Sequence, residues 1–99
     1  MNFYQSFVNQ RLRTLTTNEI VRLGPNNGGL IDLDEASKVS RLLHSLNLNV
    51  FNKDERLLLY NQITSITSQY VASEFDKIIE YYISKKKEWK SQAFYSAWL

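Results

Sequence analysis

A chain of 99 residues is long enough for one compact domain with one hydrophobic core, and too short for two such domains. Its 43% hydrophobic and 22% charged residues exclude wholesale disorder. A formal net charge of +2 lies below the strongly basic balance of most nucleic-acid-binding proteins, and the lack of cysteine excludes disulfides and thiolate metal ligands.

The start of the chain and its apolar runs bear on location. Residues 1–6 carry neither the basic segment nor the continuous apolar segment of a secretion signal. No apolar run approaches the roughly 18 residues that span a bilayer. We therefore expect a cytoplasmic protein without a membrane span.

Helical periodicity first occurs over residues 2–14. Phe3, Phe7 and Val8 recur at three- and four-residue spacing, and Leu12 continues the series. This spacing puts the four side chains on one face of a predicted helix.

Three capping boxes predict where later helices begin. In each box a short polar side chain accepts a hydrogen bond from the backbone three residues on, and a glutamate there accepts one in return. The pairs are Thr16 with Glu19, Asp32 with Glu35, and Asn52 with Glu55. They open a short helix expected to end at Gly24 and Pro25, a helix over 33–46 with Asn47 as a left-handed C-cap, and a helix over 53–65. Residues 48–50 are expected to form an extended connector.

The last predicted helix begins after Thr67 or Ser68 and carries one apolar stripe past a run of lysines. On a 3.6-residue wheel the stripe contains Val71, Phe75, Ile78, Ile79, Tyr82, Ile83, Trp89, Ala93, Phe94 and Ala97. A continuous helix over 68–97 would be about 45 Å long, whereas a body of this size has a radius of gyration near 13 Å. Either the helix breaks near Lys85 and folds back, or its end packs on another molecule.

These elements predict an all-α fold, a compact bundle of four to five helices with a long C-terminal helix. One helical domain is expected over residues 1–83, with residues 84–99 as an extension of the last helix or a fold-back tail. The predicted core consists of Leu42, Leu43, Leu46, Phe51, Leu58, Ile63, Phe75 and Ile78.

One sequence pattern runs through two of the predicted helices and the connector between them. It consists of Asp32-Leu-Asp-Glu-Ala36, Val39, Leu42-Leu43, Asn47-Leu-Asn-Val-Phe-Asn52, Glu55-Arg56 and Ile63-Thr-Ser-Ile-Thr-Ser68. This pattern resembles the YqfT-like family of small uncharacterised helical proteins of Firmicutes. Asp32 stands where the family pattern has a hydroxyl cap, and Leu48 and Val50 stand where it has isoleucines. The resemblance covers roughly residues 16–83, without the 25–29 insertion. It implies a helical fold and brings no activity with it.

No group of residues predicts catalysis or a metal site. A calcium-binding loop ending at Glu35 would have Gly24 and Gly28 at two ligand positions, so two oxygen ligands are missing. His44 is the only histidine, and no cysteine is present to share a zinc site with it. We therefore expect no enzymatic activity, no metal and no cofactor.

The C-terminal segment is the main functional candidate, because it is more aromatic than polar chain ends usually are. Tryptophan and tyrosine are common anchors at protein interfaces. A fold-back of the segment over the first helix would explain the same composition. We predict a non-enzymatic protein–protein interaction module, with self-association into a homodimer as the simplest case. The predicted partner-binding residues are Ile83, Trp89, Phe94 and Trp98.

A nucleic-acid-binding protein is the alternative. The helices over 33–46 and 53–65 have the order of a helix-turn-helix pair, but Asp54 and Glu55 at the start of the second helix would repel phosphate. The segment 85–90 combines lysines with a tryptophan, which suits single strands. The candidate residues for this function are Lys85, Lys86, Lys87 and Lys90.

Overall fold

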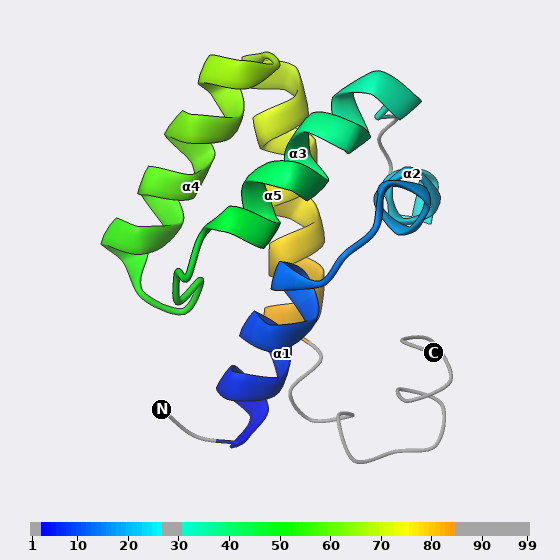
Figure 1. Ribbon diagram of the computed structural model, residues 1–99. Helices are drawn as coiled ribbons and strands as arrows, with labels where there is room; N and C mark the ends of the chain where they lie inside the picture. Colours follow the sequence, from blue (N-terminus) through cyan, green and yellow to red (C-terminus); the bar gives the residue numbers. More distant parts are fainter. Residues whose placement is uncertain (1–2, 27–30, 85–99) are drawn as a thin grey trace.

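The computed structural model describes residues 3–26 and 31–84, and these residues form an all-α fold. Its five helices are α1 (Phe3–Arg13), α2 (Thr17–Asn26), α3 (Leu33–Ser45), α4 (Lys53–Ile66) and α5 (Gln69–Ser84) (Figure 1). The two described ranges contain no strand. The predicted helical bundle is therefore confirmed. The expected extension or fold-back over residues 84–99 lies almost wholly outside the described residues and stays a prediction.

Two of the three predicted capping boxes are complete. The Thr16 and Glu19 side chains exchange hydrogen bonds with each other's backbone N–H at 3.2 and 2.9 Å. Asp32 and Glu35 do the same at the start of α3. The third box is only half formed, because the Asn52 side chain caps α4 while the Asn52 N–H donates to the carbonyl of Asn49. The Glu55 carboxylate consequently accepts from the backbone N–H of Asn49 instead.

The helix ends differ from the predicted ends by one or two residues. α2 continues to Asn26, one residue beyond the predicted end at Pro25. α3 ends at Ser45 and its C-cap is Leu46, which is extended at φ −107°, so the predicted C-cap at Asn47 was one residue too late. Of the two predicted caps for α5, the hydroxyl of Ser68 accepts from Val71 N at 3.2 Å.

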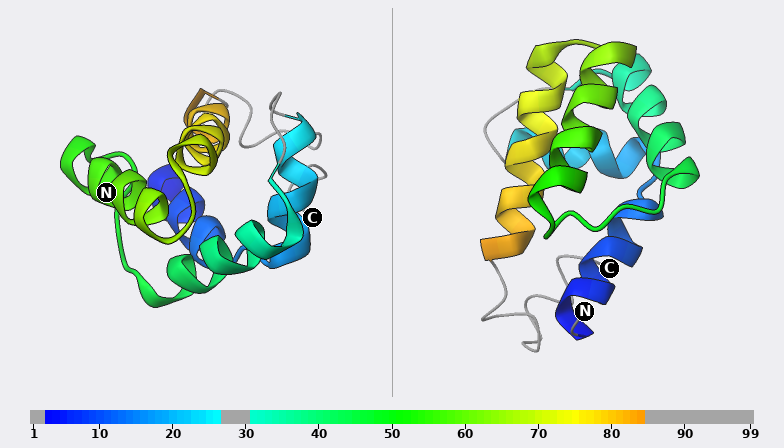
Figure 2. Two further views of the ribbon diagram at one scale, coloured as in Figure 1. Left: turned by 90° about the horizontal axis from the view of Figure 1, so that it is seen from above. Right: turned by 90° about the vertical axis from the view of Figure 1, so that its left-hand side faces the viewer.

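α5 lies between α4 on one side and α2 on the other (Figures 1 and 2). α4 packs most extensively on α5, and α2 packs most extensively on α3. α5 also supplies much of the buried apolar surface, through Val71, Ala72, Phe75, Ile78, Ile79 and Tyr82. The other helices and the connections between them contribute Tyr4, Val8, Leu12, Leu15, Ile20, Ile31, Ala36, Val39, Leu43, Val50, Leu59 and Ile63.

The predicted core is largely confirmed. Leu43, Ile63, Phe75 and Ile78 are buried, and Leu42, Leu46 and Phe51 pack against them while partly exposed. Leu58 was predicted wrongly, since its side chain is 45% exposed.

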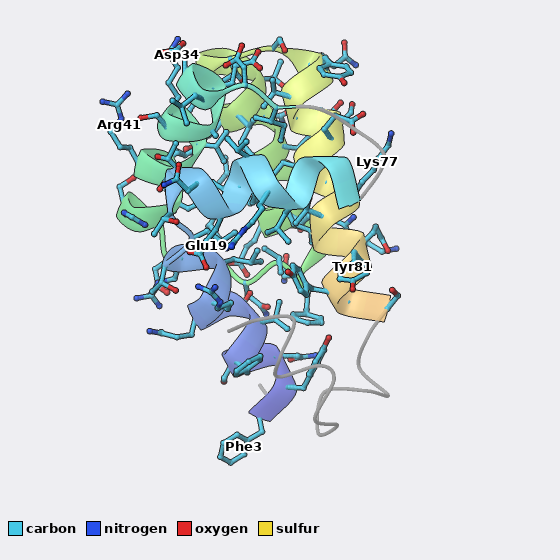
Figure 3. The ribbon with its side chains drawn as sticks, turned by 90° about the vertical axis from the view of Figure 1, so that its right-hand side faces the viewer. Phe3, Glu19, Asp34, Arg41, Lys77 and Tyr81 are labelled. Carbon is cyan, nitrogen blue, oxygen red and sulfur yellow. The ribbon has the colours of Figure 1, made fainter. Side chains whose placement is uncertain are left out.

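The buried face of α1 begins one residue later than the sequence spacing indicates. Phe3 is 83% exposed and points away from the fold (Figure 3), whereas Tyr4 is buried with Val8 and Leu12 at four-residue spacing. The Tyr4 hydroxyl donates to the backbone carbonyl of Tyr82 and so ties the first helix to the last. Burial raises the pKa of each of these two tyrosines from 10.0 to about 12, so both hydroxyls keep their protons at a higher pH than an exposed tyrosine does.

The connector between α3 and α4 is held by a side chain from α1. The amide of Asn9 donates through Nδ2 to Asn49 Oδ1 at 2.9 Å and accepts at Oδ1 from the backbone N–H of Val50 at 3.0 Å. Asn49 Oδ1 also accepts from Phe51 N at 3.1 Å. These bonds satisfy backbone donors that neither helix nor strand serves. The Asn-rich connector that carries the family resemblance therefore has a structural explanation.

Candidate interaction surface

α4 is the helix with the most apolar side chains turned to solvent. It buries only Leu59 and Ile63, while Leu57 is 57% exposed and Leu58 is 45% exposed. Consecutive helical residues are about 100° apart, so three leucines in a row cannot all face the core. In the right-hand view of Figure 2, α4 lies between α5 and α3. The outer face of α4 is therefore apolar and accessible.

We define the α4 ridge as the exposed residues Leu57, Leu58, Asn61, Ser65 and Ile66. None of them is charged, and no charged residue occurs anywhere from 57 to 73. The centres of protein interfaces are depleted of charge in the same way. Leu57, Leu58 and Ile66 are therefore exposed large apolar side chains spread over the outer half of α4 with no charge between them, a pattern typical of interaction surfaces.

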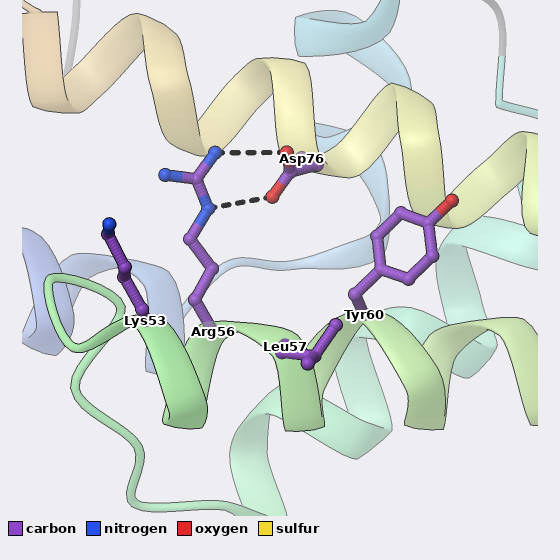
Figure 4. Close-up of a pocket in the computed structure, with 5 residues that line it drawn as sticks. All are labelled: Lys53, Arg56, Leu57, Tyr60 and Asp76. Carbon is purple, nitrogen blue, oxygen red and sulfur yellow. Dashed lines mark hydrogen bonds and ion pairs between the residues drawn. The ribbon is translucent and has the colours of Figure 1, made fainter.

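A groove of about 320 Å³ separates α4 from α5 on one side of the ridge (Figure 4). Its lining residues are Lys53, Arg56, Leu57, Tyr60 and Asp76. The Arg56 guanidinium donates to both carboxylate oxygens of Asp76 at 2.7 and 2.9 Å and reaches Glu80 Oε1 at 2.8 Å. The hydrogen bond to Asp76 raises the pKa of Arg56. These ion pairs hold α4 and α5 together across the groove.

A second groove, of about 530 Å³, separates α4 from α3 on the other side of the ridge. Leu42 and Ile66 contribute its apolar side chains, and Lys38, Arg41 and Ser45 line it from α3. Lys38 pairs with Asp34 at 3.3 Å, and Figure 3 shows Asp34 and Arg41 projecting from α3. The α4 ridge thus lies between two shallow grooves, and this shape would let another helix pack against it.

The predicted partner-binding residues are mostly outside the described part of the chain. Ile83 is half-buried and packs against the core at the end of α5. Trp89, Phe94 and Trp98 lie beyond Ser84, outside the described residues. What sequence reasoning missed is the exposure of Leu57 and Leu58, for which the run of three leucines was the available signal.

The predicted nucleic-acid residues are in a similar position, since Lys85, Lys86, Lys87 and Lys90 all lie outside the described residues. On the helix pair α3 and α4, Arg56 is neutralised by Asp76 and Glu80. Asp54 is exposed at the start of α4. The start of α4 therefore has no concentrated positive charge of the kind that binds a phosphate backbone.

Residues 3–26 and 31–84 contain no group of three His, Asp or Glu side chains arranged to hold a metal ion. Nε2 of His44 lies 3.0 Å from the carbonyl oxygen of Leu15, which explains this histidine structurally. No helix in the described part of the chain is both long and apolar enough to cross a membrane.

Comparison with known proteins supports the resemblance noted in the sequence. A family model described as a protein of unknown function (DUF2624) matches residues 1–83. The chain is 29% identical over 84 residues to the uncharacterised protein YqfT of Bacillus subtilis (strain 168), an alignment that covers 85% of this chain and all of YqfT. No solved structure matches the chain.

Proposed function

The chain belongs to the DUF2624 family of proteins of unknown function, and on that premise we propose that it is a non-enzymatic protein-interaction module whose simplest partner is a second copy of itself. The observation that carries this proposal is the α4 ridge, an uncharged helix face with two leucines about half exposed. Interfaces bury such side chains, and a monomer gains nothing from exposing them. The cytoplasmic location expected from the sequence stays a prediction.

The family match favours the α4 ridge over the C-terminal segment as the shared contact element. The match ends at residue 83, and the alignment with YqfT already covers all of that protein. Trp89, Phe94 and Trp98 lie past this end, whereas the whole ridge lies within the shared part. The apolar stripe of α5 up to Tyr82 is already buried in the monomer core. We therefore assign the aromatic residues and Ile83 a secondary role that strengthens the same association.

The test is the molar mass in solution of the full chain beside a chain that ends at Ser84. The proposal expects both to associate as concentration rises, with the shorter chain associating more weakly. If the full chain associates and the shorter chain is a folded monomer, the contact lies in the C-terminal segment and not on α4.

A binding assay with nucleic acid tests the alternative function. The proposal expects no binding of single- or double-stranded DNA or RNA at low salt. Binding that weakens steeply as salt rises would show counterion release from neutralised phosphates. That result would replace the proposed function with the alternative based on Lys85, Lys86, Lys87 and Lys90.

A further inference from the structure

Resting on the proposed function, we propose that two copies pair through an antiparallel contact between their α4 helices, with the twofold axis at Asn61. Asn61 is exposed at the middle of the ridge, about one helical turn from Leu57 and from Ser65. A twofold axis through this position makes the contact isologous, so each copy offers the same surface and the pair closes on itself.

Two residues of the ridge, Leu57 and Ser65, are complementary in size when they pair about this axis. Residues equidistant from Asn61 face each other, so Leu57 of one copy meets the partner's Ser65. Both side chains are exposed in the monomer. A large residue facing a small one lets two helices interdigitate at the usual 8–10 Å separation of their axes. A parallel pairing would instead place Leu57 against the partner's Leu57 and Ser65 against the partner's Ser65.

Charge at the two ends of the ridge favours the same arrangement. The end of α4 and the start of α5 form a corner of the molecule. α4 has no basic residue in its last turn and α5 has no acidic residue in its first turn, so the helix dipoles at this corner have no opposite charge beside them. The antiparallel pairing brings Lys53 and Asp54 to this corner of the partner. Both side chains are exposed, and neither forms an ion pair within residues 3–26 and 31–84.

The small area of the contact limits the affinity that it can reach. One face of a 14-residue helix buries on the order of 400 Å² per copy, about half of the ~800 Å² per partner in a standard interface. The ridge alone therefore supports a weak dimer, with a dissociation constant on the order of 10 μM to 1 mM.

Site-directed disulfide formation tests the arrangement, because the chain has no native cysteine. In the full chain, Asn61→Cys places two thiols next to the axis, within the Cα separation of about 4.4–6.8 Å that a disulfide needs. The matched control is Arg22→Cys, at an exposed position on α2. We expect Asn61→Cys to form covalent dimers under mild oxidation at least about tenfold faster than the control.

A mixture of two single variants tests the direction of pairing. Leu57→Cys mixed with Ser65→Cys is expected to give the mixed dimer faster than either variant forms a dimer alone. Faster dimer formation by each variant alone would indicate a parallel arrangement and overturn the proposal.

The outcomes separate this inference from the proposed function. If the full chain associates in sedimentation experiments while Asn61→Cys is oxidised no faster than Arg22→Cys, the interaction module stands and the α4 pairing is wrong. If the full chain stays monomeric at about 1 mM, both self-association and the α4 pairing are wrong.

Discussion

Leu57, Leu58 and Leu59 are chemically identical and consecutive, so replacing each by alanine separates a role in folding from a role in association. Leu59 is only 2% exposed, and Leu59→Ala is expected to lower the free energy of unfolding by about 3 kcal/mol through lost burial and the cavity left behind. Leu57 is 57% exposed. At ~0.8 kcal/mol per buried methylene, removing three carbons that are less than half buried costs about 1 kcal/mol.

Association should respond in the reverse order. If the exposed part of Leu57 is buried in the dimer, Leu57→Ala removes about 1 kcal/mol per copy, or about 2 kcal/mol per dimer. That corresponds to an approximately 30-fold rise in the dissociation constant. Leu58→Ala should have a smaller effect of the same sign, because more of its side chain is already covered.

Urea unfolding at low protein concentration measures the first quantity, and sedimentation equilibrium measures the second. Two results would contradict a role of Leu57 in association. One is a loss of stability in Leu57→Ala equal to that in Leu59→Ala, which would mean that Leu57 is part of the core. The other is a dissociation constant that changes less than about threefold.

Three further predictions concern the fold that presents the ridge. Asn9→Ala leaves the buried N–H of Val50 in the connector without its acceptor and should lower the free energy of unfolding by about 2–3 kcal/mol in a urea titration. Gln10→Ala, at an exposed position, should change the same free energy by no more than about 0.5 kcal/mol. Equal effects would contradict the role given to Asn9. The free energy of unfolding should fall between pH 10 and 12, because the unfolded state releases the protons of Tyr4 and Tyr82 near pH 10 while the folded state holds them to about 12. Chemical unfolding across this range measures the fall, and a flat profile would show that these hydroxyls are not buried. Arg56→Lys should cost about 1 kcal/mol, because lysine cannot bind both carboxylate oxygens at once, and a thermal or urea unfolding curve unchanged from the native chain would show that the pairing contributes nothing.

The helices were predictable because their start signals are local. The boxes at Thr16 and Asp32 need only residues three apart, and both form as predicted. The box at Asn52 was predicted only in part, because the competing acceptor, the carbonyl of Asn49, becomes available only when the connector turns. The bond from Asn9 to that connector joins residues forty apart and has no local signal at all.

The candidate surface was predictable in composition and not in position. The run from Leu57 to Leu59 predicts an apolar helix, and periodicity alone assigns all three leucines to a broad apolar face. Which of them reaches solvent depends on how α5 and α3 lie against α4, and no pattern within one helix contains that information. The same limit explains Phe3, which shares helical spacing with buried residues but is exposed at the first residue of α1.

Sedimentation equilibrium of the full chain, from about 10 μM to 1 mM, is the most direct test of self-association. If two copies pair through α4, the average molar mass rises from that of one chain, 11.6 kDa, toward twice that value and no further. A mass that stays at 11.6 kDa across the whole range would contradict self-association and remove the functional reading of the α4 ridge.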